Sequence, residues 1–265
     1  MTLNLRSEQI EFFLSLTPEQ QSELIAGMTP VELLALDADF EIWAHRAQLP
    51  PKSDGWRVWL MMAGRGFGKT RAGAEWVHRL ARKLPARIAI VGATIAEARS
   101  IMVEGASGIL SVARKQRHHV RWEPSLGQLR WPGGAMATLY SGDNADGLRG
   151  PEHAFAWCDE LAKWRQGKES WDNLQMGLRG GPRARALVTT TPRPIQLIEK
   201  IMKLSGTVVT GGRTGDNINL PREFVDAMIE TYGGTRLGRQ ELHGELIPEL
   251  EGALWTKAWL ERARR

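Results

Sequence analysis

The stretch Val58-Trp59-Leu60-Met61-Met62-Ala63-Gly64-Arg65-Gly66-Phe67-Gly68-Lys69-Thr70 decides the fold of this 265-residue chain. It begins with an apolar run that is typical of a buried strand and continues as a glycine-rich loop. Residues 71–77 then have the composition of a helix that begins directly after the loop. A strand, a glycine-rich loop and a helix in this order predict a phosphate-binding P-loop. The spacing is that of a Walker A motif, with Ala63 at the position of the first glycine.

The residue types in this loop suit a nucleotide phosphate. We expect its glycines at 64, 66 and 68 to adopt positive φ, so that consecutive N–H groups converge on the anion. The new helix adds its unpaired N–H groups and its positive dipole end. Lys69 is expected to reach the β- and γ-phosphates, and the Thr70 hydroxyl to ligate Mg²⁺. A glycine-rich turn that contains Lys-Thr by chance is the alternative. The residues predicted to bind ATP here are Gly64, Arg65, Gly66, Phe67, Gly68, Lys69 and Thr70.

A second candidate site follows further along the chain. Residues 153–160 resemble a short apolar strand that ends in Asp159-Glu160, which is the pattern of a Walker B motif. Asp159 is expected to hold Mg²⁺ through its water shell. Glu160 can orient and deprotonate the water that attacks the nucleotide. Such a pair is weak evidence alone, but it becomes strong downstream of a Walker A motif.

A third candidate site is the hydroxyl-rich end of another buried strand, over residues 184–192. P-loop folds place a residue that senses the γ-phosphate at this position. An ordinary β-branched strand end is the alternative. The candidate residues are Thr189, Thr190 and Thr191.

Length and composition are those of a globular protein that can bury a full core. The sequence has no apolar run of membrane-spanning length and no signal-peptide core at its N-terminus. The single cysteine, Cys158, excludes an internal disulfide framework and suits a reducing cytoplasm. Residues 1–50 contain eight acids and two bases, a net charge of −6, whereas residues 51–265 have a net charge of +11. The basic body favours a polyanionic partner such as nucleic acid.

The rest of the chain alternates between strand and helix patterns. Apolar residues at helical spacing predict two or three helices over 3–16 and 18–46, with Thr17 and Thr29 as N-caps before prolines. This acidic region is either a docking appendage or a helical cover for the sheet, and we favour the cover. Strands are predicted at 58–62, 87–93, 153–159, 184–191 and 207–210, helices at 70–83, 96–115, 169–178 and 194–204, two short helices across 221–243, and a β meander at 120–140.

This order predicts an α/β fold, a P-loop NTPase of the ASCE type with a doubly wound, mostly parallel sheet. The nucleotide is expected beyond the carboxyl ends of the strands. The glutamate beside the Walker B aspartate and an additional strand between the two motifs favour an ATPase that performs mechanical work. We divide the chain into an acidic N-terminal helical region (1–50), a P-loop ATPase core with the inserted β meander (51–215), and a small C-terminal helical lid or linker subdomain (216–265).

Five short segments of the chain resemble the ATPase domain of the large terminase subunit, the DNA-packaging motor of tailed bacteriophages, prophages and gene-transfer particles. Their order and intervals fit over most of residues 45–250. The segments are Gln48-Leu49-Pro50-Pro51, Gly64 to Thr70, Leu148-Arg149-Gly150 ahead of Asp159-Glu160, Thr189-Thr190-Thr191-Pro192, and Gln240-Glu241-Leu242-His243-Gly244-Glu245-Leu246.

The resemblance implies roles that spacing alone does not give. Gln48 matches a glutamine near the adenine, and Arg65 matches an arginine that contacts the γ-phosphate. Arg149 resembles the arginine that reaches the ATP of the neighbouring subunit, where it would stabilise developing charge. The alternatives are a solvated linker residue for Gln48 and a structural salt bridge for Arg149. Residues 216–250 would form a lid that shifts as ATP turns over. The motif that couples hydrolysis to movement would comprise Thr189, Thr190 and Thr191.

The resulting hypothesis is a hydrolase, an ATP- and Mg²⁺-dependent molecular motor that translocates double-stranded DNA into a prohead in the cytoplasm of the bacterial host. By resemblance, its partners are double-stranded DNA, the portal protein, the small terminase subunit and the prohead, with no membrane. A homo-oligomeric ring, a pentamer, is expected in the assembly, and the isolated chain can be monomeric. DNA contacts would be independent of sequence and sensitive to salt. Candidate contacts are Arg114, Lys115, Arg117, Arg183 and Arg185, and a basic solvated face is the alternative explanation for them.

Two other functions fit parts of the pattern. A helicase-like ATPase that remodels DNA or RNA should carry a second core with its own arginine finger. A nucleotide-gated assembly or adaptor protein could dock through residues 1–46 and could dispense with Glu160. Complete terminases also carry a nuclease domain with a metal-binding carboxylate cluster. No such cluster follows residues 244–246 in this sequence, so we predict no nuclease activity for these residues.

Overall fold

The structure is a computed structural model that describes residues 12–13 and 15–247. Most of the helical region predicted over 3–16 therefore lies outside the described residues. So does the part of the predicted C-terminal subdomain after residue 247.

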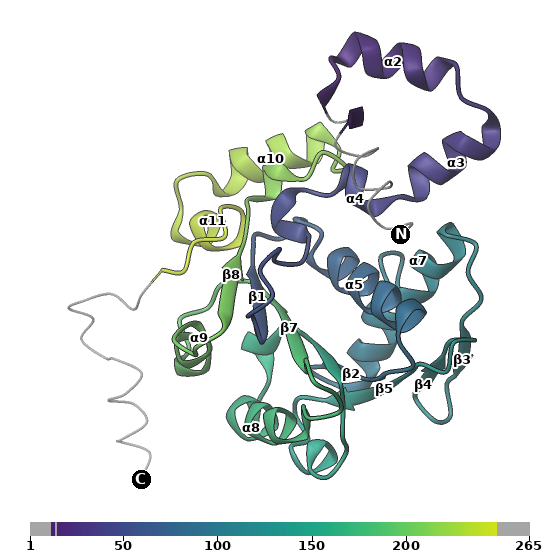
Figure 1. Ribbon diagram of the computed structural model, residues 1–265. Coiled ribbons are helices and arrows are strands. Elements are labelled where there is room, and N and C mark those ends of the chain that lie inside the picture. Colours follow the sequence, from purple (N-terminus) through teal and green to yellow (C-terminus); the bar gives the residue numbers. More distant parts are fainter. Residues whose placement is uncertain (1–11, 14, 248–265) are drawn as a thin grey trace.

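A single eight-stranded sheet forms the centre of the molecule (Figure 1). Its strands, in chain order, are β1 (Val58–Met62), β2 (Arg87–Gly92), β3 (Arg121–Glu123), β4 (Gln128–Arg130), β5 (Met136–Ser141), β6 (Phe155–Asp159), β7 (Arg185–Thr190) and β8 (Thr207–Thr210). Their order across the sheet is β3-β4-β5-β2-β6-β7-β1-β8. The pairs β3–β4 and β4–β5 are antiparallel and the other pairs are parallel. The predicted α/β fold is confirmed, and the meander extends the sheet at one side.

The register of the sheet brings the three candidate motifs together. Strand β7 lies between β1, which leads into the P-loop, and β6, which ends in Asp159. Met62 at the end of β1 is opposite Thr190, and Asp159 is opposite Thr189. Because these strands are parallel, their carboxyl ends form one edge of the sheet, where ligands of such folds bind. We call it the carboxyl edge.

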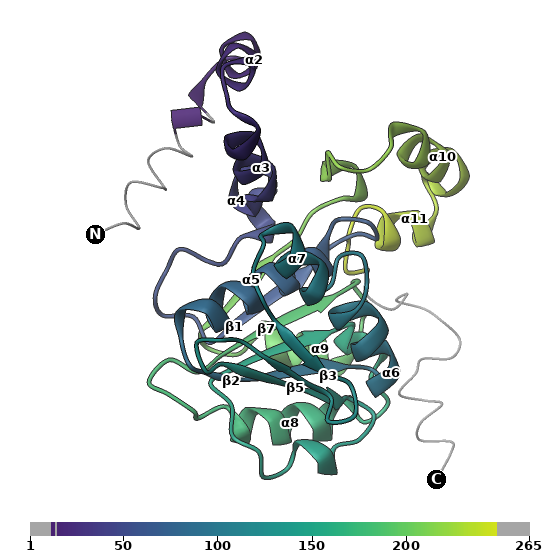
Figure 2. The same ribbon diagram turned by 90° about the vertical axis from the view of Figure 1, so that its right-hand side faces the viewer.

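Helices cover both faces of this sheet (Figure 2). Helix α5 (Lys69–Lys83) and helix α7 (Ile109–Lys115) pack on one face, and α8 (Gly167–Gly177) and α9 (Gln196–Met202) on the other. Successive residues of a strand point to opposite faces, so Trp59 joins the first core cluster and Leu60 the second. Two short helices, α10 (Arg222–Tyr232) and α11 (Arg236–Glu241), follow β8.

The continuous helix predicted over 96–115 is wrong. The chain forms α6 (Ile95–Glu97), a π-helical segment (Ala98–Val103) and then, after a break, α7. A Cβ at Gly105 would lie 2.6 Å from the carbonyl oxygen of Ile101, and one at Gly108 would lie 2.8 Å from that of Val103. The backbone therefore folds back on itself at two glycines, and apolar periodicity alone could not reveal this.

The N-terminal helices α2 (Pro18–Ala26) and α3 (Pro30–Ala38) project from the body, as Figures 1 and 2 show. Both predicted N-caps are confirmed, because Thr17 and Thr29 each form a capping box. Neither helix contains a buried residue, and Val31 is 70% exposed. The prediction that this region covers the sheet is therefore wrong for α2 and α3. Apolar spacing predicts that a helix forms but not the surface on which it packs.

Helix α4 (Phe40–Trp43) and a 3₁₀ turn (Arg46–Gln48) connect these helices to the body. No helix in the described part of the chain is both long and apolar enough to cross a membrane.

Candidate functional site

The P-loop connects the end of β1 to the first turn of α5. Gly66 and Gly68 adopt positive φ, 79° and 93°, as predicted for backbone that must turn its N–H groups inward. The same prediction is wrong for Gly64, which is not among the residues with positive φ. Gly64 is required for a different reason, since a Cβ there would lie 2.5 Å from the carbonyl oxygen of Leu242. The loop is thus packed tightly against the C-terminal part of the described chain.

Lys69 is buried at the centre of the loop, with only 7% of its surface exposed. Its Nζ donates to the carbonyl oxygens of Ala63 and Gly64, at 2.9 and 3.0 Å, and lies 3.5 Å from the Thr191 hydroxyl. Burial lowers the pKa of Lys69, and the nearby carboxylates of Glu160 and Asp159 oppose that shift. A buried ammonium held by weak neutral acceptors is well placed to exchange them for an anion.

Asp159 ends β6 as a buried carboxylate, 6% exposed. Its Oδ1 accepts a hydrogen bond of 2.6 Å from the Thr189 hydroxyl. Burial raises the pKa of Asp159 to about 6, although the hydrogen bond from Thr189 favours the charged form. The second oxygen, Oδ2, accepts no hydrogen bond from any described residue. Asp159 therefore presents one oxygen that is held in place and one that is not.

Glu160 adopts a left-handed conformation with φ 47° and ψ 44°. Such a conformation costs a residue with a side chain roughly 1–2 kcal/mol. The half-buried carboxylate accepts from the backbone N–H of Thr191 and from its hydroxyl, each at 3.4 Å. Strain of this kind is often found at functional sites, where the surroundings hold it in place.

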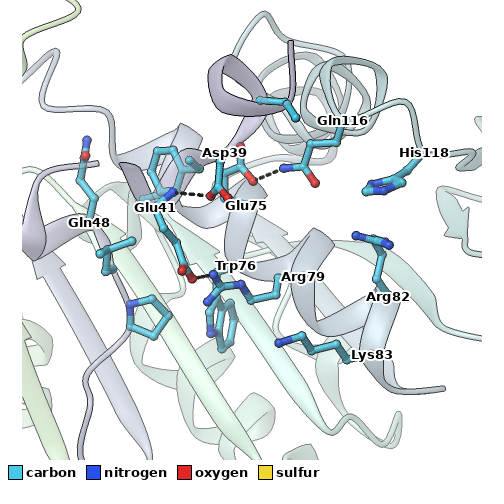
Figure 3. A pocket seen from close by; sticks show the side chains of 16 residues that line it. Asp39, Glu41, Gln48, Glu75, Trp76, Arg79, Arg82, Lys83, Gln116 and His118 are labelled. Carbon is cyan, nitrogen blue, oxygen red and sulfur yellow. Dashed lines mark hydrogen bonds and ion pairs between the residues drawn. The ribbon is translucent and has the colours of Figure 1, made fainter. Parts of the chain in front are cut away.

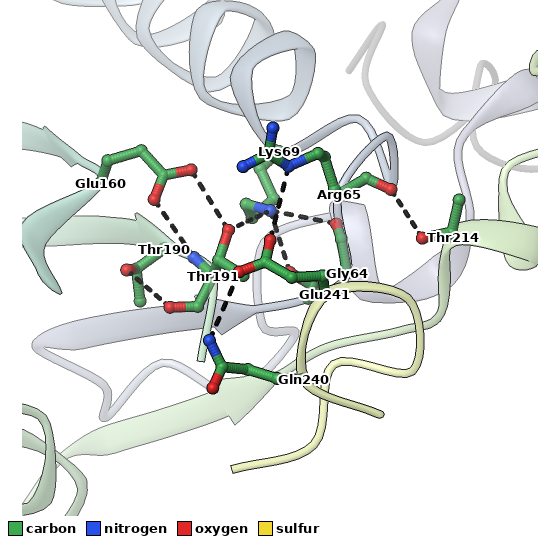
Figure 4. Close-up of polar contacts among 10 residues, drawn as sticks. Gly64, Arg65, Lys69, Glu160, Thr190, Thr191, Thr214, Gln240 and Glu241 are labelled. Atoms are coloured by element: carbon green, nitrogen blue, oxygen red, sulfur yellow. Dashed lines mark hydrogen bonds and ion pairs between the residues drawn. The ribbon is translucent and has the colours of Figure 1, made fainter. Parts of the chain in front are cut away.

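Thr191 contacts both motifs, because its hydroxyl lies near Lys69 and near Glu160 (Figure 4). The other two threonines bind different partners. The hydroxyl of Thr190 accepts from the backbone N–H of Ala162 at 3.4 Å. The three threonines of one strand end thus contact Asp159, the turn after β6, and the Lys69–Glu160 pair respectively.

Residues 214–217 and 241–244, most of which belong to the expected lid, pack against the P-loop. The backbone N–H of Arg65 donates to the carbonyl oxygen of Glu241 at 2.6 Å, and the Thr214 hydroxyl donates to that of Arg65 at 2.7 Å. Asn217 donates to the carbonyl oxygen of Gly66 at 2.7 Å. Only the segment 240–246, with its resemblance to a terminase motif, offered a signal for these contacts.

Arg65 forms an ion pair with Glu241, with Nε 3.4 Å from Oε2 (Figure 4). Its side chain is 75% exposed. The guanidinium therefore lies on the surface of the loop, where it has room to reorient towards a phosphate.

Gln48 is buried, 6% exposed, so the alternative of a solvated linker residue is wrong. Its side chain donates to the carbonyl oxygen of Phe67 at 2.6 Å and accepts from the backbone N–H of His45 at 2.8 Å. A cavity of about 640 Å³ runs from Gln48 along the outer face of α5 (Figure 3). Gln48 thus connects this cavity to the P-loop, next to Gly68, where a Cβ would lie 2.5 Å from its Nε2.

Arg149 lies outside this constellation. It follows a 3₁₀ turn (Asp146–Leu148), is exposed, and forms no ion pair with any described residue. The structural salt bridge considered as its alternative is therefore not seen. Within the described structure, no hydrogen bond or ion pair joins Arg149 to Lys69 or Asp159.

Several of the candidate DNA contacts have partners within the chain. Lys115, at the end of α7, pairs with Asp37 of α3 at 3.1 Å. Arg183 pairs with Asp54 at 3.3 Å, and Arg185 lies over the ring of Trp56, 4.2 Å from its centroid. These three basic residues therefore contact groups of the chain itself, so their presence does not require DNA as a partner.

The residues at the carboxyl edge fit a magnesium ion bound together with a nucleotide. The Thr70 hydroxyl makes no hydrogen bond to any described residue, and Asp159 has its free Oδ2. Both are oxygen ligands of the kind that Mg²⁺ prefers, and Mg²⁺ commonly takes one or two side chains plus substrate phosphates. The described residues contain no group of three or more His, Cys, Asp or Glu that could hold a metal ion without such a substrate.

Comparison with known families and structures gives an independent result. Residues 60–262 match the family described as terminase large subunit, T4likevirus-type, N-terminal. No curated protein matches the chain.

Solved structures of phage terminases share the fold. The large terminase of a thermophilic bacteriophage has a TM-score of 0.62 and 12% identity, over 81% of this chain and 53% of that one. A structure of it in complex with ADP has a TM-score of 0.61 and 13% identity, over 81% of this chain and 52% of that one. The ATPase domain of the Thermus phage P74-26 large terminase has a TM-score of 0.58 and 18% identity, over 78% and 97%. The chain thus spans about half the length of the first two structures and most of the third.

Proposed function

Because this chain belongs to the family of T4likevirus-type terminase large subunits, whose N-terminal part it matches, we propose that it is the ATP-hydrolysing motor of a DNA-packaging enzyme. The observation that carries the proposal is the bridge at the carboxyl edge. There Thr191 contacts both the buried ammonium of Lys69 and the carboxylate of Glu160, whose backbone is strained.

ATP is proposed to bind with its phosphates in the P-loop, at the N-terminus of α5. The ammonium of Lys69 would leave the carbonyl oxygens of Ala63 and Gly64 for the β- and γ-phosphates. This exchange replaces two neutral acceptors with anionic ones and so favours binding. Mg²⁺, held by Thr70 and Asp159, would neutralise charge on the same phosphates. Gln48 is proposed to contact the adenine.

Glu160 is proposed to act as the general base. It would take a proton from a water molecule as the water oxygen bonds to the γ-phosphorus and the bond to the ADP oxygen breaks. In the structure its carboxylate is held by Thr191. Arg65 is proposed to stabilise the negative charge that develops on the transferred phosphoryl group.

Coupling to movement is proposed to run through two sets of contacts. Thr191 would respond to both Lys69 and Glu160 as the γ-phosphate arrives and leaves. The contacts of Glu241, Thr214 and Asn217 with the P-loop would then transmit the change to residues 216–250, the proposed lid. The carboxylate of Glu241 would lose its ion pair whenever Arg65 turned to a phosphate.

Assembly into a ring would place Arg149 of one subunit at the ATP of the next. We propose double-stranded DNA, a portal protein, the small terminase subunit and a prohead as partners, with a pentamer as the working state in the cytoplasm of the bacterial host. We propose that the chain is divided into three parts, which are the acidic region 1–50, the ATPase core 51–215 and the lid or linker subdomain 216–265.

The test is ATP hydrolysis by the chain with double-stranded DNA, with single-stranded DNA or RNA, and without nucleic acid. We expect double-stranded DNA to stimulate turnover, and added salt to weaken the stimulation. Stimulation by single strands instead would support a helicase-like ATPase. Nucleotide binding without turnover at any protein concentration would support the adaptor function.

A mixing experiment tests the role of Arg149. Arg149→Ala and Glu160→Gln subunits should each be nearly inactive alone. Together they should recover activity, because the first retains the base and the second supplies the arginine. No recovery at concentrations where the wild type is active would contradict action between subunits.

A further inference from the structure

Trp157 lies in the middle of β6 and is fully buried, with 0% of its surface exposed. Its indole Nε1 donates a hydrogen bond of 2.9 Å to the Thr189 hydroxyl. The same hydroxyl donates to Oδ1 of Asp159 at 2.6 Å. A chain of hydrogen bonds therefore runs from a core tryptophan to the carboxylate that faces the nucleotide site.

The direction of these two hydrogen bonds follows from the donors that are present. An indole N–H can only donate, and a threonine hydroxyl has one proton and two lone pairs. The hydroxyl of Thr189 accepts from Trp157, so its single proton remains for an acceptor. Two acceptors are in reach, Oδ1 of Asp159 at 2.6 Å and the carbonyl oxygen of Cys158 at 3.3 Å. The shorter, charged acceptor is preferred.

Packing against the P-loop helix fixes the position of the indole. A Cβ added at Gly73 of α5 would lie 2.1 Å from Cε2 of Trp157. Glycine inside a helix is less favourable than alanine by roughly 0.5–1 kcal/mol. Its presence here leaves the space that the indole fills. One side chain thus contacts the P-loop helix and, through Thr189, the end of the neighbouring strand.

We propose that Trp157 is a positioning residue for the metal-binding carboxylate of Asp159. The indole orients the Thr189 hydroxyl, the hydroxyl holds Oδ1, and Oδ2 is left free towards Mg²⁺. Loss of a hydrogen-bond partner that orients a metal ligand typically lowers metal affinity by roughly ten- to a hundredfold. The inference rests on the proposed function, since it gives Asp159 its role from there.

The chain contains a matched control for this arrangement. Trp59 of β1 is also 0% exposed, and its Nε1 donates to the Thr210 hydroxyl at 2.7 Å. That hydroxyl donates to the backbone carbonyl oxygen of Ala47 at 3.0 Å, and no carboxylate takes part. Both pairs consist of a buried indole and a threonine hydroxyl. Only one of them ends on Asp159.

The experiment measures the affinity for ATPγS by calorimetry, once with Mg²⁺ and once with EDTA. The ratio is the affinity with Mg²⁺ divided by the affinity with EDTA. In Trp157→Phe and Thr189→Val we expect this ratio to fall roughly tenfold or more, with little change in the affinity in EDTA. The controls Trp59→Phe and Thr210→Val should lower the melting temperature to a similar degree and leave the ratio at the wild-type value. Thr189→Ser, which keeps the hydroxyl, should restore the ratio.

The possible outcomes separate the inference from the proposed function. A wild-type ratio in Trp157→Phe and Thr189→Val would overturn the role of Trp157 and leave the ATPase proposal intact. A similar fall of the ratio in the control Trp59→Phe would also overturn the role of Trp157, because a general loss of packing would then be the cause. A wild-type protein whose ATPγS affinity does not depend on Mg²⁺ would overturn both. Should Trp157→Phe fail to fold, a wild-type ratio in Thr189→Val would still overturn the inference.

Discussion

The two ends of strand β6 each carry a buried polar residue, and they differ in what surrounds it. Asp159 at the carboxyl end accepts a hydrogen bond from Thr189 and lies near Lys69 and Glu160. His153, just before the amino end, is 4% exposed, and neither of its ring nitrogens has a hydrogen-bond partner among the described residues. It packs edge-on against Tyr140 with ring centroids 5.3 Å apart.

Burying a polar group is costly at either end. What distinguishes the carboxyl end is that charged groups from the end of β6 and from the P-loop converge there with threonine hydroxyls from the end of β7. Convergence, rather than burial by itself, therefore indicates the functional site. We expect variants at the carboxyl end to lose activity and keep stability, and variants at the amino end to change stability and keep activity.

The largest expected effect is that of Lys69→Ala. Loss of the cation that would bind the β- and γ-phosphates should lower kcat/KM for ATP by roughly a thousandfold. Removing a buried charge should leave the melting temperature the same or higher. Steady-state hydrolysis and thermal unfolding measure the two, with the exposed Lys52→Ala as the control. Substantial remaining activity in Lys69→Ala would contradict the proposal that the P-loop binds the phosphates of ATP.

Arg65→Ala should have the next largest effect, lowering kcat by roughly ten- to a hundredfold. Its side chain is 75% exposed and its ion pair with Glu241 is long, so stability should hardly change. Arg65→Lys should recover only part of the rate, since an ammonium lacks the planar fork of donors. Equal rates for all three proteins would show that Arg65 does not approach the phosphate.

Much of the fold followed from the sequence because local patterns and global structure agree there. The strand before the P-loop, the buried strand before Asp159-Glu160 and the capped helices at Thr17 and Thr29 all lie where predicted. The break in the helix at Gly105 did not follow, because backbone packing causes it.

The contacts between the P-loop and residues 214–217 and 241–244 could not be predicted either. They join segments that are far apart in the chain, and nothing in the local pattern marks Thr214 or Asn217. The same holds for the hydrogen-bonded chain from Trp157 to Asp159, because apolar periodicity marks a tryptophan only as a core residue. Such long-range polar contacts depend on the register of the sheet.

The amino end of β6 provides a prediction about pH. Burial, with a smaller contribution from the charge of Arg87, lowers the pKa of His153 to about 4. The unfolded chain takes up a proton near pH 6.5 and the folded chain does not, so stability falls as the pH is lowered from 6.5 towards 4. At pH 5.5 this residue should cost about 1 kcal/mol of unfolding free energy.

His153→Phe should remove this part of the acid sensitivity while ATP hydrolysis at neutral pH stays unchanged. Urea unfolding at pH 7.5 and 5.5 measures the first, and steady-state turnover the second. His78, whose pKa burial also lowers to about 4, should maintain some acid sensitivity in the variant. A large loss of activity in His153→Phe would contradict the division between the two ends of the strand.

The smallest effect is expected in the projecting helices. Thr29→Ala removes the capping box of α3 and should cost about 1 kcal/mol of local helix stability. Hydrogen exchange at the amides of α3 should report the loss, whereas the melting temperature of the body and ATP turnover should not change. A fall in turnover would show that this region contributes to the active site.

The central claim is that Glu160, held in a strained conformation beside Thr191, is the base that activates water. Glu160→Gln preserves size, keeps one of the two oxygens that accept from Thr191, and removes the carboxylate that would take the proton. Steady-state ATP hydrolysis should fall about a hundredfold or more, while ATPγS binds as tightly as to the wild type. Turnover close to the wild-type rate in this variant would contradict the claim.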